Sequence, residues 1–328
     1  MDILKVDSTL VLYDYPLDYS IAENGSYYKD PETAPEQPTY QYCAVTIDKK
    51  LPNGVEYEVL EELFIPDEDK DTITKTAKAN TKFISEEIIN TLVDEALRIT
   101  NNLNNKTSKS TNLAKSSASK WRPAGTIKVW DNVVGDFVPV EGVKVRARRW
   151  FTTHTGIASA SGRYSCNGRF RRDANYSIDW ERYEFALQDG WLNGATYNGP
   201  KKRGDWNLNL NSGKQEYYAT IFSAAHFYYY GSRMGLKSPP TNATFKTKMK
   251  IAARLERDES SHIHQRRFIL SAPIYIKTYG RESQAVFGTT IHELAHAAHW
   301  NFDRDAYNNL GAGGYVLQKD GDKRTLET

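Results

Sequence analysis

The stretch Thr290-Ile291-His292-Glu293-Leu294-Ala295-His296 is the most informative part of this chain of 328 residues. It lies in a segment, residues 283–302, whose apolar spacing predicts a helix. Residues four positions apart share one helix face, so His292 and His296 can reach one ion through their imidazole nitrogens. Glu293 is rotated by about 100° from His292 and is directed toward a water on that ion instead of the ion itself. The spacing therefore predicts a site for a single Zn²⁺.

The residues around the two histidines are apolar, which fits a helix that packs inside a protein. They are Ile291, Leu294, Ala295 and Ala298. A pattern with three fixed letters in five also occurs by chance, so histidines that only pack within a core are the alternative.

The motif and its surroundings resemble the HExxH zinc metallopeptidases, or zincins, over about residues 270–300. The resemblance implies a metalloendopeptidase that hydrolyses peptide bonds, with Zn²⁺ as the cofactor and a peptide or protein as the substrate. Glu293 would be the general base, which takes a proton from a zinc-bound water and passes it to the leaving amine.

In zincins, an edge strand ahead of the active-site helix pairs with an extended substrate. The segment Ala272–Gly280 precedes the motif helix and begins near Pro273, which an edge strand tolerates. We therefore expect this segment to be the edge strand, antiparallel to the substrate. Its β-forming core is Ile274, Tyr275 and Ile276.

The third zinc ligand decides the subfamily. Metzincins carry HExxHxxGxxH, but His299 stands at the glycine position and Phe302 at the final histidine position. This departure disfavours the metzincins. His299 shares a face with His292 and is an alternative third ligand, although the two lie about 10 Å apart along a straight helix.

Gluzincins take a glutamate from a later helix. Glu327 is the only glutamate after the motif, and it follows Thr325-Leu326 as at a helix start. We expect Glu327 to complete a gluzincin-like site with His292 and His296, leaving one position for water. Such a domain continues beyond its third ligand, so we expect the natural chain to extend past Thr328.

A second pattern, in residues 121–190, consists of short alternating strands separated by turn residues. It predicts a small antiparallel β-sandwich. The expected strands are Thr126–Trp130, Val143–Ala147, Gly162–Ser165 and Tyr176–Trp180. Their order, with Pro139-Val-Glu-Gly142-Val followed by Gly162-Arg-Tyr164, resembles the transthyretin-like, carboxypeptidase-regulatory-like domain. The resemblance implies an accessory module without catalysis.

These patterns predict an α+β multidomain fold. Residues 1–120 form a mixed region with a helix at 85–100 and a polar linker at 101–120. The sandwich occupies 121–190, and a zincin-like catalytic domain occupies 191–328. In this last domain we expect a helix at Glu216–Tyr230 and strands at Met249–Leu255 and Phe268–Tyr279.

Composition restricts the partners. Lys and Arg number 43 against 41 Asp and Glu, so the net charge of +2 gives no footprint for nucleic acid. No apolar run is long enough for a transmembrane segment, and no signal peptide is visible. Taken literally, this indicates a cytoplasmic protein, but an exported protein whose signal lies outside these residues would look the same. We expect the second case, a secreted or surface-anchored protein. Cys43 and Cys166 are either one bridge or two unrelated thiols.

A different class of function stays open at this point. The same scaffold can serve a non-catalytic surface-binding or adhesion protein, with its substrate face rebuilt around the 21 tyrosines of the chain. Glu293 argues against this alternative, because a scaffold that needs only the metal does not need the base.

Overall fold

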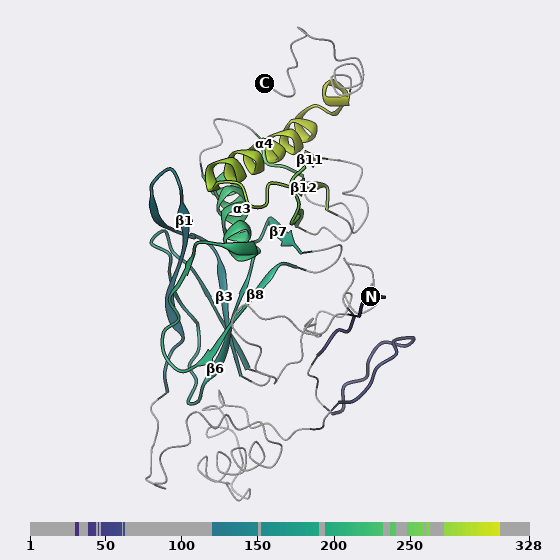
Figure 1. Ribbon diagram of the computed structural model, residues 1–328. Coiled ribbons are helices and arrows are strands. Elements are labelled where there is room, and N and C mark those ends of the chain that lie inside the picture. Colours follow the sequence, from purple (N-terminus) through teal and green to yellow (C-terminus); the bar gives the residue numbers. More distant parts are fainter. Residues whose placement is uncertain are drawn as a thin grey trace, which may run out of the picture.

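The protein combines α and β structure, and strands predominate in the part of the chain described by the computed structural model. Figure 1 shows a β-rich body with two long helices, α3 (Gly213–Tyr230) and α4 (Ser283–Phe302), at one end. The described residues are 30–32, 39–43, 45, 47–60, 62, 120–149, 152–189, 194–231, 237–240, 248–258, 260–262 and 272–308. The helix expected at 85–100 and the linker up to residue 119 lie outside them.

Two four-stranded sheets form the sandwich. In the first sheet β1 is central; its strands are β1 (Ala124–Asp131), β2 (Asp136–Pro139), β5 (Arg163–Ser165) and β9 (Leu208–Leu210). The second has the order β4 (Thr152–Ile157), β3 (Lys144–Arg149), β6 (Ala174–Asp179), β8 (Thr196–Lys202). Alternate residues such as Val145 and Ala147 are fully buried between the sheets. All four strands expected in this region are present.

A third sheet lies beside the helices. Its order is β11 (Ser261–His262), β12 (Ile274–Ile276), β10 (Met249–Ala253), β7 (Phe185–Gln188). β7, β10 and β12 run parallel, whereas β11 is antiparallel to β12. The pairing of β12 on both sides corrects the expectation that Ala272–Gly280 forms an edge strand. β11 takes the edge because Ser261 and His262 pair with Tyr275 and Ile274.

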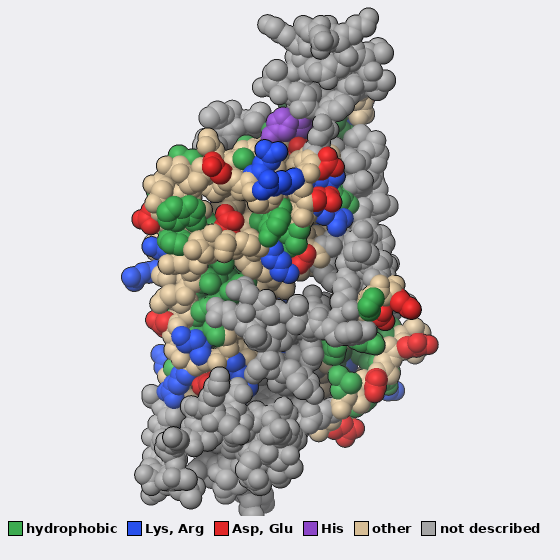
Figure 2. Space-filling view, viewed as in Figure 1, with side chains coloured by type: hydrophobic (Ala, Val, Ile, Leu, Met, Phe, Trp, Pro, Cys, Tyr) green, Lys and Arg blue, Asp and Glu red, His purple; other side chains and the backbone are tan. Residues whose placement is uncertain are grey.

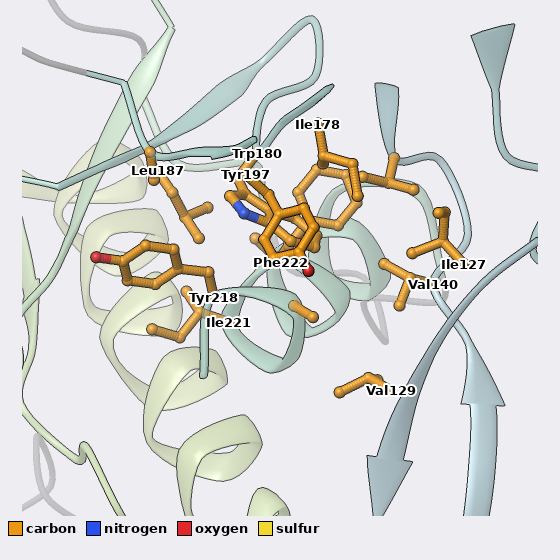
Figure 3. Packing of buried hydrophobic residues seen from close by; sticks show 14 of the residues in the cluster. Ile127, Val129, Val140, Ile178, Trp180, Leu187, Tyr197, Tyr218, Ile221 and Phe222 are labelled. Atoms are coloured by element: carbon orange, nitrogen blue, oxygen red, sulfur yellow. The ribbon is translucent and has the colours of Figure 1, made fainter. Parts of the chain in front are cut away.

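α3 is the central helix of the core. It is buried on several sides, as expected for a helix that is apolar around much of its circumference. Phe222 packs against Trp180 and Phe185, with ring centroids 5.8 and 5.3 Å apart. Figure 3 shows Tyr218, Ile221 and Phe222 of α3 together with Leu187 of β7, Tyr197 of β8 and Trp180, which follows β6. None of the described helices is long and apolar enough to cross a membrane.

The boundary predicted at residue 190 does not separate the sheets. β7 precedes this boundary but pairs with β10, while β8 and β9 follow it and pair with β6 and β1 of the sandwich. The physical reason is that Phe185 and Leu187 are buried in the same hydrophobic cluster as α3 and β10. The sandwich and the helices therefore share one continuous core.

An ionic cluster joins the sandwich to the third sheet. Lys144 of β3 and Lys248, which precedes β10, donate hydrogen bonds of 2.7 and 2.8 Å to the two carboxylate oxygens of Glu181. Burial alone would raise the pKa of Glu181, but these two lysines outweigh it and lower the pKa to about 2. The charged carboxylate is thus favoured in the folded protein.

Replacing Glu181 with glutamine should lower the free energy of unfolding by about 1–2 kcal/mol at neutral pH. Because the folded-state pKa lies below the unfolded value of about 4.3, this stabilisation is present above about pH 4.3 and is lost as the pH falls toward 2. Urea unfolding at neutral pH and at about pH 3 measures the difference, which should shrink at the lower pH. The control is Asp258→Asn, which removes an exposed partner of Lys277 and should change stability by less than about 0.5 kcal/mol at either pH. An equal loss for Glu181→Gln at both pH values would contradict this account.

Candidate metal centre

The motif helix α4 is held between α3 and the third sheet. It follows β12 after a connection at residues 277–282 and lies beside both β11 and β12. Phe287 of α4 contacts Phe227 of α3, with ring centroids 5.9 Å apart. The residues of α4 that turn into the core are apolar for the most part and include Val286, Leu294, Ala297, Ala298 and Trp300. This packing fixes which helix face is left for the histidines.

His292 and His296 come together on the half-buried face of α4. Their Nε2 atoms are 2.8 Å apart, and their ring planes are nearly perpendicular, with centroids 4.3 Å apart. The helix spacing therefore brings together the two nitrogens that were expected to share an ion. Figure 2 shows histidine at the surface in the upper part of the molecule, where Figure 1 places α4, with lysine and arginine nearby.

The two nitrogens fit a zinc ion after a small movement. A tetrahedral zinc holds two imidazole nitrogens, each at about 2.0–2.1 Å, roughly 3.3 Å from each other. The rings must therefore separate by about 0.5 Å, which small side-chain rotations provide. Without a metal, one Nε2 must carry a proton to hydrogen-bond the other, and a bound cation would replace that proton.

Glu293 lies next to the histidine pair but inside the protein. The residue is only 5% exposed. Burying a carboxylate is costly unless other groups compensate for the lost water, so glutamate is seldom buried without a specific interaction or role. Glu293 does interact with other groups in the fold. Glu293 is therefore a buried carboxylate one residue from His292, and its role as general base stays a prediction.

The described residues do not supply a complete metal shell. Among them, no group of three or more His, Cys, Asp or Glu side chains is arranged to hold an ion. Glu327 lies outside the described residues, so its role as third ligand stays a prediction. His299 is partly buried, and its ring lies edge-on to that of Tyr307, with centroids 5.4 Å apart.

Tyr307 also faces the motif. Its ring lies 6.2 Å from that of His296, again edge-on. It is brought there by the short helical turn after α4, which Asp303 caps by accepting a hydrogen bond from the backbone of Ala306. Nothing in the spacing of the sequence distinguished this tyrosine from others in the segment.

The connection that leads into α4 is tied down by residues distant in the sequence. The hydroxyl of Tyr217 on α3 donates to the carbonyl of Ile276 at 2.9 Å and accepts from the amide of Thr278 at 3.1 Å. Arg257 donates to the carbonyl of Tyr279 at 2.9 Å. A single sequence carries no signal for these contacts, because each depends on which strands become neighbours.

Comparison with known proteins gives no relative. No protein-family model, no curated protein and no solved structure matches the chain.

Proposed function

We propose that the protein is a zinc-dependent metalloendopeptidase whose ion is held by His292 and His296. The convergence of their two Nε2 atoms at 2.8 Å, beside the buried Glu293, carries this proposal. If the two histidines served only for packing, there would be no reason to bury the charged side chain of Glu293, which lies between them in the sequence.

In this proposal the chain contributes a base, a ligand pair and, among the described strands, the edge strand β11. Bound zinc would supply a water of lowered pKa and would polarise the substrate carbonyl. Glu293 accepts the proton of the attacking water on its carboxylate and returns it to the leaving amine. The helix α4, which carries His292 and His296, packs on α3 and on the third sheet. This packing limits the movement of the two imidazole rings.

The edge of the third sheet supports a peptide as the substrate. Among the described strands, β11 is the antiparallel edge strand next to α4, and an edge strand has backbone groups that can pair with an extended chain. β11 would thus have the role that the sequence assigned to the segment around Ile274, Tyr275 and Ile276.

Metal removal tests the proposal. The purified chain should bind about one equivalent of zinc and cleave peptides from a library of mixed sequence. Dialysis against a chelator should reduce cleavage by at least about tenfold, and added zinc should restore it. Mass spectrometry of the products identifies the cleaved bonds.

Two other results of this experiment would count against a zinc peptidase. Cleavage that is unchanged after complete metal removal would show that the proposed chemistry is wrong. Tight zinc binding without cleavage of any library peptide would favour the alternative of a non-catalytic binding protein on the same scaffold.

A further inference from the structure

The N-terminus of α4 is capped by the sandwich and not by its own sequence. The first amides of a helix lack partners within the helix. The residue at the N-cap position, Glu282, makes no side-chain capping hydrogen bond. Instead, the Oδ1 atom of Asn132, in the turn between β1 and β2, accepts from the amide of Gln284 at 2.8 Å and from the hydroxyl of Ser283 at 2.5 Å.

Two further hydrogen bonds complete this contact. The backbone amide of Asn132 donates to Oγ of Ser283 at 2.9 Å, and its side-chain Nδ2 donates to Oε2 of Glu282 at 3.1 Å. Ser283 is 7% exposed, so its hydroxyl depends on protein partners. The backbone amide, Oδ1 and Nδ2 of Asn132 therefore all form hydrogen bonds with residues at the start of α4.

The turn that carries Asn132 is itself well defined. The carboxylate of Asp131 accepts from the amides of Val133 and Val134 at 2.8 and 3.1 Å, and its carbonyl accepts from the amide of Gly135 at 2.8 Å. Gly135 has a φ of 70°, which closes the turn in a conformation that favours glycine. A turn organised in this way holds the Asn132 side chain in place.

We propose that Asn132 is a positioning residue for the metal centre: it fixes where α4 begins, and thereby where His292 and His296 are presented. This inference rests on the proposed function. An α-helix is stiff along its axis, so a constraint at Ser283 is transmitted to His292, roughly 14 Å further along. The far end of α4 is fixed separately, by buried Trp300 and by the hydrogen bond of 3.0 Å from Asn301 to the carbonyl of Ser238.

The proposal gives the sandwich a role beyond that of an accessory module. If the cap is removed, the helix start can move, and only part of the population presents the histidines correctly. The apparent metal affinity falls by that fraction. From the usual effect of losing a helix cap, Asn132→Ala should weaken metal binding by about three- to tenfold.

Cobalt(II) is the probe, because its visible absorption spectrum reports the coordination geometry as well as the affinity. Asn132→Ala should lower the cobalt affinity, change the intensity of the absorption bands and speed amide hydrogen exchange at residues 284–286. The matched control is Val134→Ala, which truncates an exposed side chain of the same turn and should change none of these.

A rescue experiment separates positioning from a general loss of stability. Asn132→Asp keeps the oxygen that accepts from Ser283 and Gln284, but it sets a second negative charge beside Glu282. Adding Glu282→Gln places an amide at position 282 that can donate to the new carboxylate at position 132, which reverses the original hydrogen bond. The double variant should regain the wild-type cobalt affinity and spectrum. This cycle carries the test even if Asn132→Ala does not fold.

The possible failures are distinguishable. A wild-type protein that binds neither zinc nor cobalt overturns the proposed function, and the role of Asn132 at the metal with it. A wild-type protein that binds cobalt, with Asn132→Ala identical to Val134→Ala in affinity and spectrum, overturns the positioning role alone. Failure of Glu282→Gln to restore the Asn132→Asp protein also overturns it.

Discussion

Glu293→Gln is expected to leave the metal bound and to reduce peptide cleavage by at least about a thousandfold. The amide has nearly the size of the carboxylate but cannot accept the proton of the attacking water. Because a neutral amide costs less to bury than a charged carboxylate, the variant should fold as well as the wild type. The loss should appear in kcat, since the group acts in the transition state and not in ground-state binding.

The measurement is the steady-state cleavage of one library-derived peptide, alongside the zinc content of both proteins. Glu256→Gln is the matched control, because that carboxylate is 58% exposed and makes a surface ion pair of 3.6 Å with Lys277. It should keep full activity. Glu293 is not the general base if the Glu293→Gln protein retains activity within about tenfold of the wild type.

The local features of the fold could be predicted from the sequence. The motif helix was expected at 283–302 and is found at Ser283–Phe302, and the helix expected at Glu216–Tyr230 begins three residues earlier, at Gly213. Helices and strands of this kind are encoded by the spacing of apolar residues, which any single sequence contains. The strand expected at Met249–Leu255 was recognised for the same reason and is found at Met249–Ala253.

The arrangement of the strands could not be predicted in the same way. Pairing depends on contacts between residues far apart in the chain, and a strand of two residues such as β11 has no periodicity to detect. The edge position was therefore assigned to β12, whose Ile274 and Ile276 are fully buried. Burial of these two side chains is typical of an interior strand, but the same alternation also fits an edge strand.

In the candidate site, too, the local features could be predicted and the long-range contacts could not. His292 and His296 share a helix face through their spacing, so the sequence was sufficient to predict that their ring nitrogens come together, whereas the role of Glu293 stays a prediction. Asn132 lies about 150 residues from its partners Ser283 and Gln284, and only the folded chain brings it to the start of α4. Local chemistry was thus visible in the sequence, whereas the groups that support it were not.

The other large effect is expected at the ligands. His292→Ala or His296→Ala should weaken zinc binding by more than about a hundredfold, because each removes one of the few protein ligands and opens the shell to water. Fold should be retained, since both side chains are only half-buried and neither belongs to the hydrophobic core. Zinc competition with a chromogenic chelator measures the affinity, and circular dichroism monitors the fold.

The same assay distinguishes the candidates for the third ligand. Two histidines leave an ion open at two positions, and hydrolysis needs one of them for water, so one further protein group is required. Glu327→Ala should therefore weaken zinc binding by about tenfold or more, whereas His299→Ala, with its ring against Tyr307, should change it by less than about threefold. A loss of affinity in His299→Ala but not in Glu327→Ala would exclude the gluzincin-like ligand set. Full zinc occupancy in a protein lacking both His292 and His296 would exclude the metal centre altogether, because the ion would then be bound elsewhere.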